Sequence, residues 1–304
     1  MILFSSPRFA EHLPPPGHPE RPERAEVFEA IASAWRDRGG TVREPRAATR
    51  AELARVHTSA YLDTIESCAG RAVMLDADTF TSTATYEIAR LAAGAAIEAA
   101  LHAFRTGEPA VALIRPPGHH AEAGRAMGFC LFNNVAIAAV TLRESGAQRV
   151  AIVDIDVHHG NGTQAAFYAD PSVLYISSHQ YPYYPGTGAA DDTGSAAGTG
   201  FTVNVPLEAG AVDADFEMSY RSIVIPALER FRPDALLVSA GFDAHERDPL
   251  GEMRMTTAGY ARLVSMLDDA ARRLCGRRLA LVTEGGYDLE ALRDCLQATI
   301  SVIT

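Results

Sequence analysis

The sequence lacks the patterns of disulfide-rich, thiolate-metal and membrane-spanning proteins. No two of its four cysteines form a CxxC pair, which argues against a disulfide framework and against a zinc site built from thiolates. No run reaches the ~18–20 apolar residues that a membrane span requires. The first residues do not show the basic segment followed by an apolar one that marks a secretory signal. We therefore expect a protein of the reducing cytoplasm with no membrane partner.

The sequence also contains fewer basic than acidic residues. The 304 residues contain 27 basic and 38 acidic side chains, which gives a net charge of −11. Nucleic-acid binding that ignores sequence depends on Lys and Arg side chains that neutralise phosphates. We therefore expect no nucleic-acid partner, whereas cationic partners such as lysine-rich segments are compatible with this charge.

Short apolar runs alternate along the chain with longer stretches of helical periodicity. The runs that read as strands are Ala110–Ile114, Val150–Val153, Ser172–Ser177, Leu236–Val238 and Leu279–Val282. No internal repeat or low-complexity linker interrupts this alternation, and only Gly186–Gly200 has the composition of a loop. The pattern predicts an α/β fold whose mainly parallel sheet is covered by helices on both faces. A chain of this length is near the upper limit for one core, so we expect one domain over residues 1–304.

Polar clusters follow four of the predicted strands. They are "RPPGHH" (Arg115–His120), "DIDVHHGN" (Asp154–Asn161), "SAGFDAHERDPLG" (Ser239–Gly251) and "TEGGYD" (Thr283–Asp288). Ligands of open α/β sheets bind outside the carboxyl ends of the strands. We therefore expect the four clusters to meet at one edge of the sheet and to form an active site.

Two of these clusters contain a candidate metal site. Asp156 and His158 are two residues apart, so in an extended segment they point to the same side. Asp243, at the end of another strand, completes a set of three ligands. Three protein ligands and one open position are typical of catalytic zinc, although Fe²⁺ or Co²⁺ would accept the same oxygen and nitrogen donors. A lone D-x-H is more often a hydrogen-bonded loop pair, so the prediction depends on the neighbouring clusters.

The same edge offers acid–base groups. Adjacent histidines in a loop usually indicate only a polar loop, but "RPPG" stiffens the approach to His119 and His120, which should face the metal. Histidine exchanges protons near neutral pH, with a water or with a leaving amine. Asp154 and Asn161 are candidates to orient the two rings. Tyr287 is a candidate donor of its O–H to a developing oxyanion.

Taken together, these motifs resemble the zinc-dependent histone deacetylase family, whose superfamily includes acetylpolyamine amidohydrolases and acetoin-utilisation proteins. The resemblance extends from His18 to Tyr287 and rests on "RPPGHHAEAGRAMGFCLFNNVAIAA", "VAIVDIDVHHGNGTQ", "YPGTG", "SAGFDAHERDPLG" and "TEGGYD". The segments "FNN", "HHGNG" and "EGGY" resemble class II more than class I. The resemblance implies an arginase-like fold, with one domain built on a parallel sheet of about eight strands.

The resemblance also implies catalytic roles. Asp156, His158 and Asp243 would bind zinc, and Tyr287 would polarise the acyl carbonyl. His120 would be the main general base and acid, with His119, bonded to Asp154, as an electrostatic helper. Asn161 stands where class I members carry Asp, and a neutral amide orients the ring of His120 without raising its pKa as a carboxylate would.

Further implied positions surround the substrate and alkali cations. Gly128, Phe129 and Tyr184 would line the acyl-lysine tunnel, with Tyr184 in place of the family's usual Phe, and Asp78 would bind the substrate backbone. One structural K⁺ site would use Asp154, Ser177 and Ser178 together with the backbone oxygens of Asp156 and His158. A second K⁺ site would lie near Phe167, Asp170, Val173 and Phe201.

The implied reaction is hydrolysis of acyl-lysine in a protein or peptide to acetate and a free amine. An acetylpolyamine amidohydrolase, which acts on a small acylated amine, is the first alternative. An arginase-type dimanganese hydrolase would need further metal ligands, and a catalytically silent acyl-lysine binder would lack the chemistry. Polyamine-selective members carry a glutamate after the Asp-Pro of "RDPLG", where this chain has Leu250, and Glu246 could replace that charge if its loop folds inward. No pattern indicates an oligomeric state.

Overall fold

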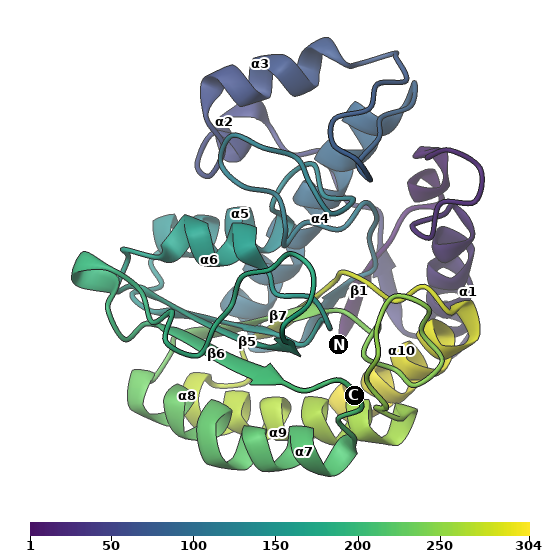
Figure 1. Cartoon of the computed structure of the whole chain (residues 1–304). Helices are drawn as coiled ribbons and strands as arrows, with labels where there is room; N and C mark the ends of the chain where they lie inside the picture. The colour runs from purple at the N-terminus through teal and green to yellow at the C-terminus, as the bar shows by residue number, and fades with distance from the viewer.

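The computed structural model describes residues 1–304 and contains one sheet of eight strands (Figure 1). The order of strands in the sheet is β2-β1-β3-β8-β7-β4-β5-β6, and every neighbouring pair is parallel. The bounds are β1 (Ile2–Phe4), β2 (Thr41–Arg43), β3 (Ala110–Ala112), β4 (Val150–Asp154), β5 (Val173–Gln180), β6 (Thr202–Leu207), β7 (Ala235–Ala240) and β8 (Leu279–Thr283). The predicted α/β class with a parallel sheet is confirmed.

Helices cover both faces of this sheet (Figure 1). One face packs against α1 (Glu23–Asp37), α7 (Asp213–Ser219), α8 (Ile225–Phe231), α9 (Thr257–Cys275) and α10 (Leu289–Ile303). The other face packs against α4 (Thr85–Thr106), α5 (Asn134–Glu144) and α6 (Asn161–Phe167), and α2 (Arg50–Leu53) and α3 (Ser59–Ser67) pack outside α4 and α5. Short 3-10 helices occupy Pro7–Glu11 and Ala196–Gly198, and a π-helical turn, Tyr220–Val224, precedes α8. Because both faces are covered, every residue of β3, β4, β5, β7 and β8 is buried.

Local sequence signals set several of the boundaries. Helix α9 begins at Thr257 and ends at Cys275, because the Thr256 side chain accepts from Gly259 N and Gly276 adopts a left-handed φ of 60°. Strand β3 ends at Ala112, two residues before the predicted end, because the N–H of Ile114 donates to the Thr283 hydroxyl at 2.8 Å. Strand β4 is one residue longer than predicted and includes Asp154.

The strand order explains how distant segments meet. Strands β3, β8, β7 and β4 are consecutive neighbours, and these are the four strands that the polar clusters follow. Because they are parallel, their carboxyl ends lie at one edge, so the four clusters face a common region. Among the helices, none is both long enough and apolar enough to pass through a membrane.

Candidate active site

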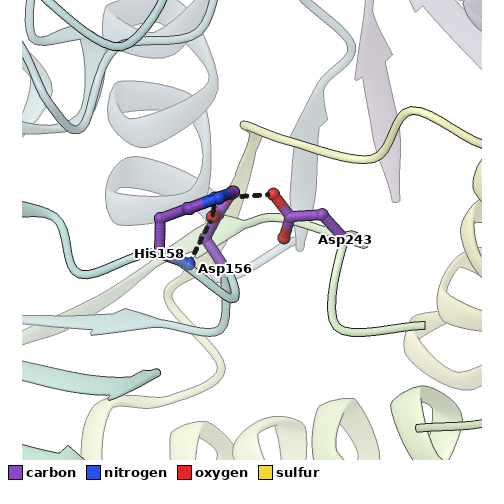
Figure 2. Close-up of side chains that lie close together, drawn as sticks. All are labelled: Asp156, His158 and Asp243. Atoms are coloured by element: carbon purple, nitrogen blue, oxygen red, sulfur yellow. Dashed lines mark hydrogen bonds and ion pairs between the residues drawn. The ribbon is translucent and has the colours of Figure 1, made fainter. Parts of the chain in front are cut away.

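Three buried side chains from two strand ends form a compact group (Figure 2). Asp156 and His158 follow β4, and Asp243 follows β7. His158 Nδ1 lies 3.0 Å from Asp156 Oδ1 and 3.2 Å from Asp243 Oδ2, and one ligand atom from each residue falls within 4.8 Å of the others. The structure therefore brings together the three residues predicted as metal ligands.

The electrostatics of this group suit a cation. Burial disfavours the imidazolium of His158, yet hydrogen bonds to the two carboxylates raise its pKa to about 10. Burial, together with the nearby Asp156, raises the pKa of Asp243 to about 7. A positive charge is thus favoured between the carboxylates, and the mixed oxygen and nitrogen donors fit a divalent metal. Glycine at position 285 leaves space for the carboxylate of Asp243, because a Cβ at this position would lie 2.0 Å from Asp243 Oδ2.

The two adjacent histidines each contact a different partner. His119 Nδ1 lies 3.0 Å from Asp154 Oδ2, as predicted, and His120 Nδ1 lies 2.8 Å from Asn161 Oδ1. Asn161 Nδ2 donates to Glu122 Oε1 at 2.9 Å. A carboxylate oxygen accepts, so the amide nitrogen must face Glu122 and the amide oxygen must accept a hydrogen bond from the Nδ1–H of His120. His120 Nε2 then has a free lone pair.

The charges of these two rings differ. Although burial disfavours its imidazolium, Asp154 and Asp156 raise the pKa of His119 well above the ordinary value. Burial lowers the pKa of His120 well below its ordinary value, and the nearby His119 and His158 act in the same direction. The arrangement therefore favours a charged His119 beside a neutral His120, whose Nε2 is able to accept a proton.

Tyr287 is held at the same site by its ring and its backbone. The guanidinium of Arg24 lies 5.1 Å from the ring centroid, and the Phe129 ring approaches edge-on at 5.7 Å. The backbone N–H of Tyr287 donates to Asp248 Oδ2 at 2.6 Å. The phenol oxygen makes no hydrogen bond, so it remains available to a ligand.

A cavity of about 200 Å³, here called the central cavity, joins these groups to the surface. Its lining consists of Asp78, His120, Gly128, Phe129, His158, Tyr183, Tyr184, Leu250 and Tyr287. The residues predicted from the sequence to line a tunnel are thus brought together, and Tyr184 presents its ring edge to His120 at 5.2 Å. The cavity is smaller than the 300–1,000 Å³ sites that hold drug-sized ligands, and its volume suits a slender chain.

The backbone of one cavity wall has an uncommon conformation. Phe129 has a φ of 67°, a region that non-glycine residues rarely adopt, and its N–H donates to Thr79 Oγ1 at 3.0 Å. At Gly128, with φ 57°, a Cβ would lie 2.4 Å from the His120 ring. Only glycine therefore permits this wall to approach the histidine so closely.

The remaining predicted positions are found around this centre. Asp78 lines the cavity and accepts from Gly128 N at 3.2 Å. Ser177 pairs with Asp154 across β4 and β5, and Ser178 Oγ donates to Asp154 O at 3.4 Å. Glu246 is exposed and does not line the central cavity. The second predicted K⁺ region, Phe167, Asp170, Val173 and Phe201, lies where α6 leads into β5 and at the start of β6.

Sequence reasoning missed several residues that contact the site. They are Arg24, Glu122, Tyr183, Asp248 and Glu284. Tyr183 stacks on His158 with ring centroids 5.8 Å apart, and its position beside Tyr184 was a usable signal. Asp248 and Glu284 stood inside quoted motifs, but nothing local indicated what their carboxylates would contact. Glu122 likewise stood inside one of these motifs, and Arg24 gave no signal of its own.

Comparisons with known proteins point to one family. The histone deacetylase domain model matches residues 18–303. The crystal structure of the HDA15 HD domain superposes with a TM-score of 0.93 and 40% identity, over 99% of this chain and 88% of that one. Histone deacetylase 15 of Arabidopsis thaliana is 43% identical over 94% of this chain and 52% of its own length. Histone deacetylase-like amidohydrolase of Pseudomonas aeruginosa is 42% identical over 95% of this chain and 77% of its own.

The length of these relatives limits how far the likeness extends. The chain spans about half of the Arabidopsis protein but about four-fifths of a probable deacetylase of Archaeoglobus fulgidus, to which it is 39% identical. The match covers all four polar clusters and the whole sheet from β2 onward. The motifs, the fold and the family model agree, and this chain belongs to the histone deacetylase family.

Proposed function

We propose that residues 1–304 form one catalytic domain that removes acetyl groups from lysine side chains of proteins or peptides by metal-dependent amide hydrolysis. The observation that carries this proposal is that one member of each of three units, His158, His120 and Tyr287, lines the central cavity. The Asp156–His158–Asp243 group, the His119–His120 pair and Tyr287 come from four different strand ends and converge there. Membership of a deacetylase family supports the same conclusion.

Zinc is the proposed metal, held by Asp156, His158 and Asp243. When bound, it would supply Lewis-acid polarisation of the acyl carbonyl and increase the acidity of water. The three donors leave a further position open, as catalytic zinc requires. Fe²⁺ or Co²⁺ would be accepted by the same donors.

His120 is the proposed general base and acid. Its Nε2 has the free lone pair that takes a proton from the attacking water, and the protonated ring then gives a proton to the departing lysine amine. Asn161, fixed by Glu122, keeps the ring in the tautomer that this role requires. His119, charged and bonded to Asp154, contributes electrostatic stabilisation of the negative charge that develops on the acyl oxygen.

Tyr287 is the proposed oxyanion donor. Its hydroxyl has no partner within the protein, so it is free to donate to the acyl oxygen. Arg24 and Phe129 fix the ring from two sides, which places the donor before the reaction begins. Such preorganised donors are among the largest contributions to catalysis.

The lining of the cavity favours acyl-lysine over acetylpolyamines. The aromatic walls of Phe129 and Tyr184 suit the apolar lysine stem, and Leu250 offers no charge to a secondary ammonium. Glu246, whose place in the sequence would let it replace this charge, is exposed and away from the lining, and the one carboxylate of the lining, Asp78, accepts from Gly128 N. Asp78 is proposed to bind the substrate backbone at the rim.

Structural K⁺ is proposed at Asp154, Ser177 and Ser178, where the end of β4 lies beside β5. The cytoplasmic location stays a prediction, because two relatives are named as chloroplastic proteins. The absence of a nucleic-acid partner likewise stays a prediction from the acidic charge.

Turnover of an acetyl-lysine peptide by the purified protein tests the proposal. We expect the wild type to release acetate and a chelator to abolish this release. In His120→Ala, the rate of release should fall by about 10²–10⁴-fold. The matched control is His102→Ala, which removes a partly buried histidine bonded to Glu108, away from the cavity. Equal turnover by wild type and His120→Ala would refute the assigned role.

A further inference from the structure

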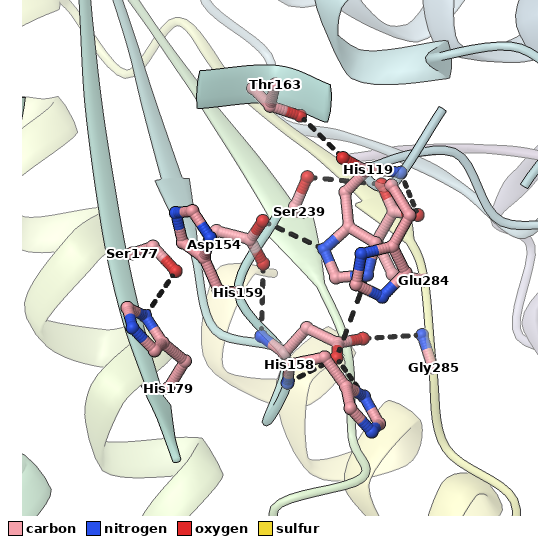
Figure 3. A network of polar contacts seen from close by, with 12 residues as sticks. His119, Asp154, His158, His159, Thr163, Ser177, His179, Ser239, Glu284 and Gly285 are labelled. Carbon is pink, nitrogen blue, oxygen red and sulfur yellow. Dashed lines mark hydrogen bonds and ion pairs between the residues drawn. The ribbon is translucent and has the colours of Figure 1, made fainter. Parts of the chain in front are cut away.

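Glu284 is a fully buried carboxylate without a role in the reaction described above. It directly follows β8, which lies between β3 and β7 in the sheet. Its side chain reaches to both neighbours (Figure 3). Oε2 accepts from Gly118 N at 2.6 Å and from His119 N at 3.2 Å, and Oε1 accepts from Ser239 Oγ at 3.1 Å.

The contact with the β3 side involves the segment that carries the histidine pair. Gly118 and His119 belong to the loop that leads into His120, and their backbone N–H groups are buried. A buried N–H without an acceptor is destabilising, so these donors depend on the Glu284 oxygen. The same carboxylate holds Ser239, four residues before Asp243, at the end of β7.

The backbone of Glu284 is fixed independently of its side chain. Its N–H donates to Ala240 O at 3.0 Å, and its carbonyl accepts from Arg24 Nη2. Arg24 also donates through Nε to Gly286 O at 2.8 Å. The segment that presents Tyr287 is thus anchored to α1 and β7, and the Glu284 side chain extends from this anchored segment to the histidine loop.

We infer that Glu284 is a positioning residue, whose carboxylate fixes the backbone of Gly118 and His119 and so sets where His120 stands relative to Tyr287 and the metal-ligand group. The inference rests on the proposed roles of His120 and Tyr287. It requires the hydrogen bonds of Glu284 and not its negative charge. Misplacement of a reacting group by about 1 Å can cost roughly 10²-fold in rate.

Two conservative variants separate hydrogen bonding from charge. In Glu284→Gln, the amide oxygen accepts from Gly118 and His119, and the amide N–H₂ donates to Ser239, whose hydroxyl is able to accept as well as donate. In Glu284→Asp, the charge remains but the arm is one methylene shorter and no longer reaches the loop. Positioning therefore predicts a higher kcat for Glu284→Gln than for Glu284→Asp.

The experiment measures kcat and KM for an acetyl-lysine peptide, bound zinc and thermal unfolding for both variants and for Glu284→Ala. We expect kcat to fall by about 10²-fold in Glu284→Ala and Glu284→Asp with little change in KM, and by less than about tenfold in Glu284→Gln. Zinc content should remain, since none of the three ligands is altered. Asp268→Asn is the control for loss of a buried carboxylate, because Asp268 pairs with Arg272 and Arg277 away from the cavity. It should lower stability and leave kcat unchanged.

Each outcome of this experiment either supports or overturns the positioning role of Glu284. A kcat in Glu284→Asp equal to or above that in Glu284→Gln would overturn it in favour of a role for the charge. A wild-type kcat in both Glu284→Asp and Glu284→Gln would also overturn the inference. If Glu284→Ala does not fold, the order of the other two variants still decides. Absence of turnover in the wild type would instead refute the proposed function, which keeps the two failures distinct.

Discussion

Replacing Tyr287 with phenylalanine isolates the proposed oxyanion donor. The ring contacts with Arg24 and Phe129, at 5.1 and 5.7 Å, do not involve the hydroxyl, and the backbone bond to Asp248 is also retained. Because the phenol oxygen makes no hydrogen bond in the free protein, its removal should change the free energy of unfolding by less than about 1 kcal/mol. Loss of one oxyanion donor should nevertheless lower kcat by about 10²–10³-fold, or roughly 2.7–4 kcal/mol of barrier.

Steady-state kinetics with an acetyl-lysine peptide, together with thermal unfolding, test this expectation. KM should change far less than kcat, because the donor bonds most strongly to the charge of the transition state. Phe104→Leu, on α4 away from the cavity, serves as a matched aromatic control with wild-type kcat expected. If Tyr287→Phe keeps the wild-type kcat, the hydroxyl does not reach the reacting carbonyl and the assigned role is wrong.

Three further predictions concern the metal, the substrate and acid stability. Asp243→Ala should lower bound zinc and activity together, because a site that loses one of three ligands holds the ion poorly; full zinc occupancy by elemental analysis would contradict the ligand assignment. Leu250→Glu should shift the kcat/KM ratio of acetylspermidine to acetyl-lysine peptide upward by about ten- to a hundredfold, the effect of a charge-assisted contact of ~1.5–3 kcal/mol; an unchanged ratio would show that Leu250 does not govern selectivity. Glu20 is fully buried, and although burial favours its neutral form, Arg115, His12 and Arg24 hold its pKa well below the ordinary value. Its folded pKa is the lower one, so its contribution to stability is complete above the unfolded pKa of about 4.3 and is lost as the pH falls toward the folded value. Glu20→Gln should therefore cost about 3–5 kcal/mol at pH 7 and progressively less below pH ~4, and a loss that is independent of pH would contradict the ion pairing.

The parts of the site that the sequence predicted share one property. Asp156, His158, Asp243 and Tyr287 each follow closely after an apolar run long enough to be recognised as a strand, and parallel strands bring such positions to one edge. Local pattern was therefore enough to predict the convergence. It was not enough to predict which strands are neighbours, and the adjacency of β3, β8, β7 and β4 emerged only from the structure.

The residues that the sequence did not predict contact the site from distant positions in the chain. Arg24 meets the segment of Tyr287 across 262 positions of the chain, and Asp248 meets it across 39. No periodicity in the sequence encodes such a pairing. Strands β1, β2 and β6 were not among the predicted strands: β2 contains a single apolar residue, and Pro206 interrupts the pattern of β6.

Reconstitution with zinc tests the central claim most directly. The protein is stripped of metal, zinc is added back in steps, and release of free amine is followed from an acetyl-lysine peptide and, in parallel, from acetylspermidine. The chain contains no lysine, so new side-chain amines arise only from the substrate. We predict no hydrolysis without metal, full activity at one zinc per chain, and a kcat/KM for the peptide at least about tenfold above that for acetylspermidine. Hydrolysis that persists without metal, or a preference for acetylspermidine, would contradict the account.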